Sequence, residues 1–101
     1  MAKEMIVQIQ QVELDERDSL VVVPEKTNSE NFQFIWRDAS GVRWDEDRLC
    51  FYAWEPEKWE KANFFRQVVL AVKNELGIKL QINRNTKWTN VPIEIREQIE
   101  R

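Results

Sequence analysis

The residue types best suited to bind a partner are gathered in one polar stretch near the C-terminus. Trp88 stands there beside Arg84 and Lys87, with asparagines on both sides. An indole ring among cationic and amide side chains can stack on a nucleic-acid base while its neighbours contact phosphate. In the alternative interpretation, Trp88 folds back over one end of the core and its polar neighbours face water.

The chain has five tryptophans, and each combines a large apolar surface with one N–H donor. Trp36 and Trp54 fit core strands, whereas Trp44, beside an acidic turn, and Trp59, among charged residues, are expected to be partly exposed. Tryptophan is common in the hot spots of protein interfaces. The candidate binding residues are therefore Trp88, Arg84, Lys87, Trp44 and Trp59.

Most catalytic and metal-binding templates lack their residues. The chain has no histidine and one cysteine, so histidine-based triads, zinc sites and iron–sulfur sites cannot be assembled from it. Cys50 lies in the most hydrophobic segment, where a thiol is usually a buried, inert group. Gly41 and Gly77 are isolated, which excludes a glycine-rich phosphate loop. We expect no catalytic residue, metal or cofactor.

One carboxylate cluster is a weaker candidate for chemistry. Two adjacent turns could bring four acids together to hold a hard cation or act as an acid–base pair. Interleaved arginines make local ion pairing the simpler interpretation. The four acids are Asp38, Asp45, Glu46 and Asp47.

Alternating or β-branched segments predict the strands that position these residues. The segment 48–54 is apolar on both faces, with Cys50, Tyr52 and Trp54 on one side, and this pattern predicts a central strand. The predicted strands are 5–12, 19–23, 32–37, 42–44, 48–54 and 78–83.

Two helices are expected. Pro56 and Gly77 stand where a first helical residue and a terminating glycine belong, so a helix is predicted near 56–76 with a broad apolar stripe. Residues 84–90 form a polar connection, and Pro92 opens a short second helix. The sequence thus predicts an α+β fold: a mainly antiparallel sheet of about five to six strands, one long helix packed across a face, and a short C-terminal helix.

Composition sets the class of protein. With 101 residues and 43% hydrophobic content, we expect a single α+β domain over residues 1–101. The sequence shows no apolar run of roughly 18 residues, as a membrane span would need, and its single cysteine favours the cytoplasm. The charge is unevenly distributed, because residues 1–58 hold 13 acids and 7 bases while residues 59–101 hold 5 acids and 8 bases. The first part of the chain is therefore acidic and the second part is basic, which can mean a basic binding face or two halves that attract each other in the fold.

Three functional hypotheses follow. The first is a non-catalytic protein-interaction module, such as a regulatory subunit, adaptor or inhibitor, whose partner is another protein or a second copy of the chain. The second is nucleic-acid binding through segment 84–90, which the net charge of −3 disfavours. The third is a small-molecule-binding domain or enzyme with a carboxylate and arginine site. No membrane partner is expected.

Overall fold

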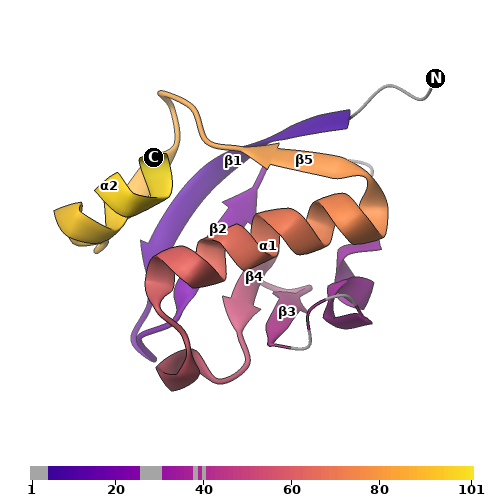
Figure 1. Ribbon diagram of the computed structural model, residues 1–101, viewed down its shortest axis with the longest axis horizontal. Helices are drawn as coiled ribbons and strands as arrows, with labels where there is room; N and C mark the ends of the chain where they lie inside the picture. The colour runs from indigo at the N-terminus through magenta and orange to yellow at the C-terminus, as the bar shows by residue number, and fades with distance from the viewer. Residues whose placement is uncertain (1–4, 26–30, 38, 40) are drawn as a thin grey trace.

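The computed structural model describes residues 5–25, 31–37, 39 and 41–101, and within them six strands form one sheet (Figure 1). The strand order is β3-β4-β2-β1-β5, and β6 pairs with β1 farther along that strand. The strands are β1 Met5–Leu14, β2 Leu20–Pro24, β3 Val42–Asp45, β4 Cys50–Ala53, β5 Ile78–Gln81 and β6 Lys87–Thr89. The pairings β1–β2, β2–β4 and β3–β4 are antiparallel, and β5 and β6 each pair with β1 in parallel. The prediction of a mainly antiparallel sheet is confirmed.

The long strand β1 connects the two parallel pairs. Its first half pairs with β5 through Met5–Gln8, and its second half pairs with β6 from Gln11 onward. The register against β2 shifts between Ile9 and Gln11. Such an irregularity inserts one residue and changes which side chains face the core. Val7 and Ile9 are therefore buried before it, and Val12 is buried after it.

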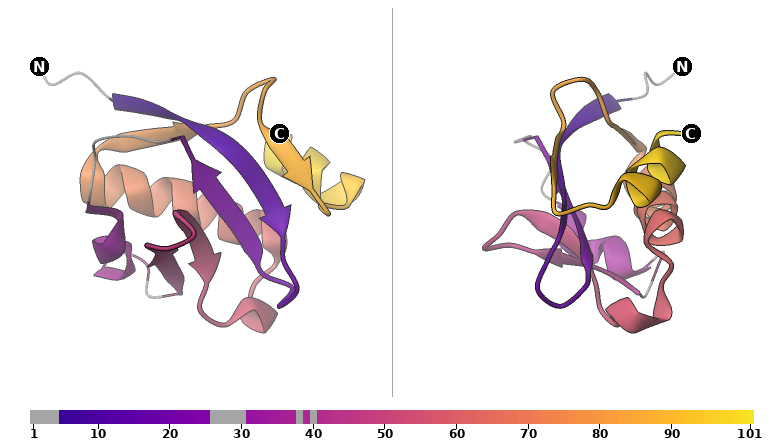
Figure 2. Two further views of the ribbon diagram at one scale, coloured as in Figure 1. Left: turned by 180° about the vertical axis from the view of Figure 1, so that it is seen from behind. Right: turned by 90° about the vertical axis from the view of Figure 1, so that its left-hand side faces the viewer.

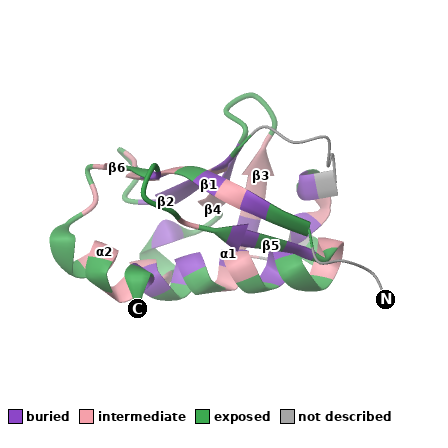
Figure 3. Cartoon of the chain, turned by 90° about the horizontal axis from the view of Figure 1, so that it is seen from above, coloured by how far each residue is buried: buried purple, intermediate pink, exposed green. Residues whose placement is uncertain are grey.

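Helix α1 (Lys61–Leu76) lies across one face of the sheet, as predicted (Figures 1 and 2). Its buried residues recur at helical spacing, so the helix alternates buried and exposed side chains along its length (Figure 3). The buried residues are Ala62, Phe64, Phe65, Val68, Ala71 and Val72. They join the inward side chains of β1, β2, β4 and β5 in one core cluster.

Both ends of α1 follow local backbone chemistry. Gly77 ends the helix with φ 68°, and its N–H donates to the Lys73 carbonyl. The predicted start at Pro56 is wrong, because residues Pro56–Lys58 form only a 3-10 turn, η2, and Trp59 is extended with φ −117°. The α-helix begins two residues after Trp59, so this residue precedes the helix, and its ring packs on Phe64 of α1 from outside.

Residues 32–37 were predicted as a strand, and this is wrong. They lie within a 3-10 helix, η1 (Asn31–Arg37), in which Phe32 and Ile35 are both fully buried. A helical turn places residues three apart on one side, whereas a strand would place these two on opposite faces. Phe32 packs in the core against two other aromatic rings, and this contact favours the turn. The side chain of Trp36 lies outside the described part of the structure.

Two loops also differ from the prediction. Leu49 was assigned to the strand 48–54, but it lies in the turn before β4 with φ 55° and is 49% exposed. The Asp45 carboxylate closes this turn by accepting the N–H groups of Asp47 and Arg48 at 2.9 and 3.0 Å. Segment 84–90 was predicted to be a connection, yet it contains β6.

The short C-terminal helix is confirmed as α2 (Ile93–Glu100), which packs against α1 with Ile99 buried. Figure 2 shows both helices on the same side of the sheet. No helix in the described ranges is long and apolar enough to cross a bilayer.

Candidate interaction site

The sheet face opposite α1 carries the candidate site. In β1 and β4 the core-facing residues alternate with Glu13, Cys50 and Tyr52, which therefore point to this second face. Register pairs Arg43 with Tyr52 and Asp45 with Cys50 across β3 and β4. We call the surface away from α1 the open face. Both described α-helices lie on the other side of the sheet, so the open face is formed by charged and aromatic side chains.

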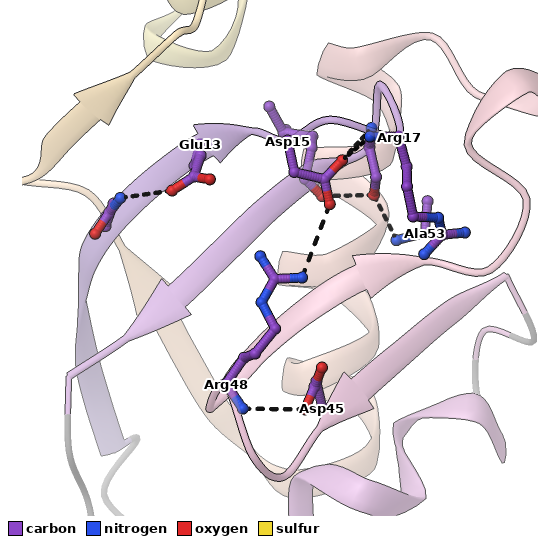
Figure 4. A network of polar contacts seen from close by, with 9 residues as sticks. Glu13, Asp15, Arg17, Asp45, Arg48 and Ala53 are labelled. Carbon is purple, nitrogen blue, oxygen red and sulfur yellow. Dashed lines mark hydrogen bonds and ion pairs between the residues drawn. The ribbon is translucent and has the colours of Figure 1, made fainter.

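An arginine–carboxylate contact joins the turn after β1 to the turn between β3 and β4 (Figure 4). The Asp15 carboxylate accepts the backbone N–H groups of Arg17 and Ser19 at 2.9 and 3.0 Å, and its other oxygen lies 3.9 Å from an Arg48 nitrogen. The Asp15 side chain is 9% exposed and that of Arg48 is 50% exposed. The acid is thus held beneath the surface, and the guanidinium is presented to solvent.

Ser19 connects β2 to β4 below that contact. Its side chain is fully buried, and its hydroxyl accepts the Ala53 N–H at 3.0 Å and donates to the Leu20 carbonyl at 3.3 Å. This hydroxyl therefore extends the short β2–β4 pairing, and it holds the C-terminal end of β4 against the sheet.

Two arginine–aromatic contacts involve the outward side chain of β4, Tyr52, and the residue just after β4, Trp54. The Arg17 guanidinium carbon lies 5.9 Å from the centre of the Tyr52 ring, and that of Arg43 lies 5.0 Å from the Trp54 ring. Arg43 is also the cross-strand partner of Tyr52. This part of the open face thus combines arginine with aromatic side chains, and both residue types are enriched in interface hot spots.

Trp54 was predicted to lie in a core strand, but it lies just beyond β4 and is 55% exposed. The Trp54 backbone N–H donates to the Gly41 carbonyl at 3.0 Å, which continues the β3–β4 ladder by one residue. The alternation in 48–54 correctly placed Trp54 on the side of Cys50 and Tyr52. It could not show that this side ends in solvent.

A pocket of about 350 Å³ opens next to Trp54. Trp59 forms another of its walls, packing edge-to-face on Phe64 with ring centres 5.5 Å apart. A Cβ at Gly41 would approach the Trp59 ring to 2.6 Å, so only glycine admits the indole here. Two tryptophans thus line a cavity whose charged groups come from neighbouring turns and β3. The lining residues are Gly41, Arg43, Trp54, Glu55, Lys58 and Trp59.

The other predicted tryptophans have partners within the protein. Trp44 is partly buried in an aromatic cluster with Phe32 and Phe51. The centre of its ring lies 4.8 Å from the centre of each of the other two rings. Trp88 is partly buried against the core, and the Arg96 guanidinium carbon lies 5.0 Å from its ring centre. Both rings therefore cover parts of the core.

Of the five predicted binding residues, Trp59 alone lines the pocket. Arg84 is exposed in the connection between β5 and β6, and Lys87 is exposed at the start of β6, where it is the register partner of Gln11 on β1. The structure adds Arg17, Arg43 and Tyr52, which sequence reasoning did not select. The available signal was the alternation of β4, which puts Tyr52 and Trp54 on one side.

Comparison with known proteins identifies the family. Residues 7–86 match the sequence pattern of the family described as Integron Cassette Protein Hfx_Cass5. The chain belongs to this family. A solved structure, "Structure from the mobile metagenome of North West Arm Sewage Outfall: Integron Cassette Protein Hfx_Cass5", is 29% identical and is aligned over 98% of this chain and 93% of its own, with a TM-score of 0.44. No curated protein matches. The family match includes every pocket residue, and Trp88 lies beyond it.

The remaining chemical candidates have structural roles. Burial raises the pKa of the Cys50 thiol from 9.0 to about 11, against the opposing effect of Arg48, and nearby acids raise it further. A neutral thiol is a poor nucleophile. Asp45 supports its turn, Asp38 lies outside the described residues, and those residues contain no group of three possible metal ligands.

Proposed function

We propose that this protein is a small non-catalytic interaction module that binds another protein through the open face. The observation that carries the proposal is the exposure of Trp54, 55% of whose surface meets solvent beside a second tryptophan and a stacked arginine. A large indole exposed next to charged side chains is the composition of an interface hot spot with a polar rim.

The surrounding geometry supports a rigid docking surface. The Trp54 backbone is bonded to Gly41 and its ring lies under the Arg43 guanidinium, whereas the Trp59 ring packs on Phe64. Side chains already ordered in the free protein lose less conformational entropy on binding.

We place the protein in the reducing cytoplasm as part of this proposal, because its single cysteine, Cys50, is free and buried.

The segment around Trp88 supports nucleic-acid binding less well. Its ring lies under Arg96 and against the core, so stacking on a base would require it to give up those contacts. The pocket at Trp54 requires no such rearrangement, and this difference supports our proposal of an interaction module over nucleic-acid binding.

The proposal is tested by comparing what three tagged forms retain from their native lysate. We expect the wild type and the control Leu70→Ala to retain a stoichiometric protein, and Trp54→Ala to lose it. Leu70 is a suitable control because it is 50% exposed on α1. Nuclease treatment and sedimentation accompany the comparison, so that nucleic acid or a second copy of the chain is recognised as the partner.

A protein retained equally by all three forms would refute a role for the open face. Nucleic acid recovered in proportion to the bait, and lost in Arg84→Gln, would favour segment 84–90 instead. If sedimentation shows a dimer that Trp54→Ala dissociates, the partner is a second copy.

A further inference from the structure

The part of the sheet formed by β5, β6 and the first half of β1 has cations and no acid. Residues 76–93 contain Lys79, Arg84 and Lys87 but no Asp or Glu, and residues 5–12 of β1 are uncharged. Because β1 pairs with both β5 and β6, these two acid-free segments are joined in the fold. We call the three cations the cationic strip. In a chain of net charge −3, the strip is a local reversal of sign.

Both lysines of the strip point to the open face. Lys79 stands between Ile78 and Leu80 on β5, which are buried in the core, so its own side chain points to the opposite side. Trp88 packs against the core, so Lys87 before it on β6 also points away from α1. All three cations of the strip are exposed.

The turn between β5 and β6 holds Arg84 in a fixed backbone. The Asn83 side chain donates to the Gln8 side-chain oxygen at 2.7 Å, and its own oxygen accepts the Asn85 N–H at 2.6 Å. The Thr86 hydroxyl donates to β1 on the other side of Arg84. The turn is thus tied to β1 before any partner binds, which reduces the conformational entropy lost on binding.

The register gives the length of the strip. Lys79 is paired with Ile6 and Lys87 with Gln11, and five residues of extended strand span roughly 16 Å. An extended peptide places side chains on the same face about every 7 Å. Three acids at alternate positions of such a peptide would therefore cover most of the strip.

The acids that border the strip bind other groups. Glu13 accepts the Gln11 side-chain N–H at 2.9 Å, and Glu25 accepts the Gln8 backbone N–H at 3.0 Å. Within the part of the chain that the structure describes, none of the three strip cations forms an ion pair. The strip therefore presents positive charge that the described fold does not neutralise.

We infer that the cationic strip binds an acidic segment of the partner protein that docks on the open face. The inference rests on the proposed function and specifies the chemistry of the partner, and charge complementarity carries it. Strand β5 lies three strand spacings from β4, or roughly 14 Å across the sheet. One interface of standard size, about 800 Å² per partner, can therefore include both Trp54 and the strip.

A nucleic acid suits the strip less well than a short acidic segment. Residues 1–58 hold 13 acids against 7 bases, so a long polyanion would be repelled by much of the molecule. A short segment meets the strip alone, because exposed charges farther away than about 8 Å are largely screened at physiological salt.

The test uses defined peptides and the backbone N–H signals of the folded protein in nitrogen-edited NMR. The probe is acetyl-Ser-Glu-Ser-Glu-Ser-Glu-Ser-amide, and the matched controls replace all its glutamates by glutamine or by lysine. We expect the probe to shift the signals of Lys79, Arg84 and Lys87 saturably, and each control peptide to bind at least about tenfold more weakly. Raising the salt from about 20 to about 200 mM should weaken probe binding, because the contacts are exposed.

Two triple variants give the second readout. The strip variant replaces Lys79, Arg84 and Lys87 by glutamine and should bind the probe at least about tenfold more weakly. The control variant makes the same change in net charge at exposed cations outside the strip and should bind within about twofold of the wild type. Its substitutions are Lys58→Gln, Arg66→Gln and Arg101→Gln. The same spectra show that both variants are folded.

Equal binding of the glutamate and glutamine peptides, equal affinity of the two triple variants, or no binding at low salt would overturn the inference. A thymidine tetranucleotide, whose three phosphates match the charge of the probe, would overturn it in favour of nucleic acid if it binds the strip more tightly than the peptide does.

The lysate comparison separates this inference from the proposed function. A partner that is lost in Trp54→Ala but fully retained by the strip variant would reject the inference and leave the proposed function standing. The expected peptide binding with no Trp54-dependent partner would instead reject the proposed function and leave the strip as a separate site for acidic peptides.

Discussion

The Thr86 hydroxyl holds together the place where β1 changes partners, and replacing it gives a sharp test of the fold. Thr86 is buried, and its hydroxyl donates to the Ile9 carbonyl at 2.7 Å and accepts the Asn83 N–H at 2.9 Å. Ile9 lies between the residues of β1 that pair with β5 and those that pair with β6. The side chain therefore supplies a hydrogen bond where neither parallel strand continues the ladder.

The Thr86→Val substitution keeps the shape and removes both hydrogen bonds. A buried carbonyl that loses its partner costs about 1 to 3 kcal/mol. Asn83 is exposed, so water can replace part of the second bond. We expect the free energy of unfolding to fall by about 2 to 3 kcal/mol, which lowers the melting temperature of a chain this size by roughly 8 to 24 °C.

Urea denaturation of wild type, Thr86→Val and Thr86→Ser measures the effect. Thr86→Ser retains the hydroxyl and loses one methyl group, so it should cost only about 1 kcal/mol. The dependence of the unfolding free energy on urea should be the same for all three forms if the unfolding reaction is unchanged. A valine variant as stable as the wild type, or less damaging than the serine variant, would show that the hydroxyl does not support β1.

The remaining predictions concern the end of α1 and the buried thiol. Gly77→Ala should lower the free energy of unfolding by about 1 kcal/mol in urea denaturation, because a φ of 68° strains a residue that has a Cβ. A Cβ at this position would meet no neighbouring atom within 4 Å, so the cost comes from the backbone alone. Gly77→Asn should cost less, because asparagine tolerates the left-handed backbone better than alanine. Because the folded-state pKa of Cys50 is about 11 and the unfolded value is 9.0, its contribution to stability is intact below pH 9 and is lost as pH rises toward 11. The unfolding free energy of the wild type should therefore fall more steeply over that interval than that of Cys50→Ala, by roughly 2 to 3 kcal/mol in total. Parallel slopes for the two proteins would contradict the burial of the thiol.

Sequence alone determined the elements whose signals are local. The stripe of α1 and the glycine after it were readable because helical spacing and left-handed backbone depend on near neighbours in the chain. The alternation of Ile78 and Leu80 fixed the inward side of β5 for the same reason. The α+β class followed from the order of these elements.

Only the tertiary structure decided which surfaces are covered. Trp54 belongs to an apolar strand pattern that suits a strand buried on both sides, but α1 and α2 pack on the same side of the sheet, and the indole is left in solvent. The segment 32–37 alternates as a strand would, yet the ring cluster of Phe32, Trp44 and Phe51 favours a helical turn. Strand β6 pairs with β1 beyond the register shift near Ile9, and the Thr86 hydroxyl bonds the Ile9 carbonyl where β1 changes partners. These outcomes depend on contacts between residues far apart in the chain, which no local pattern encodes.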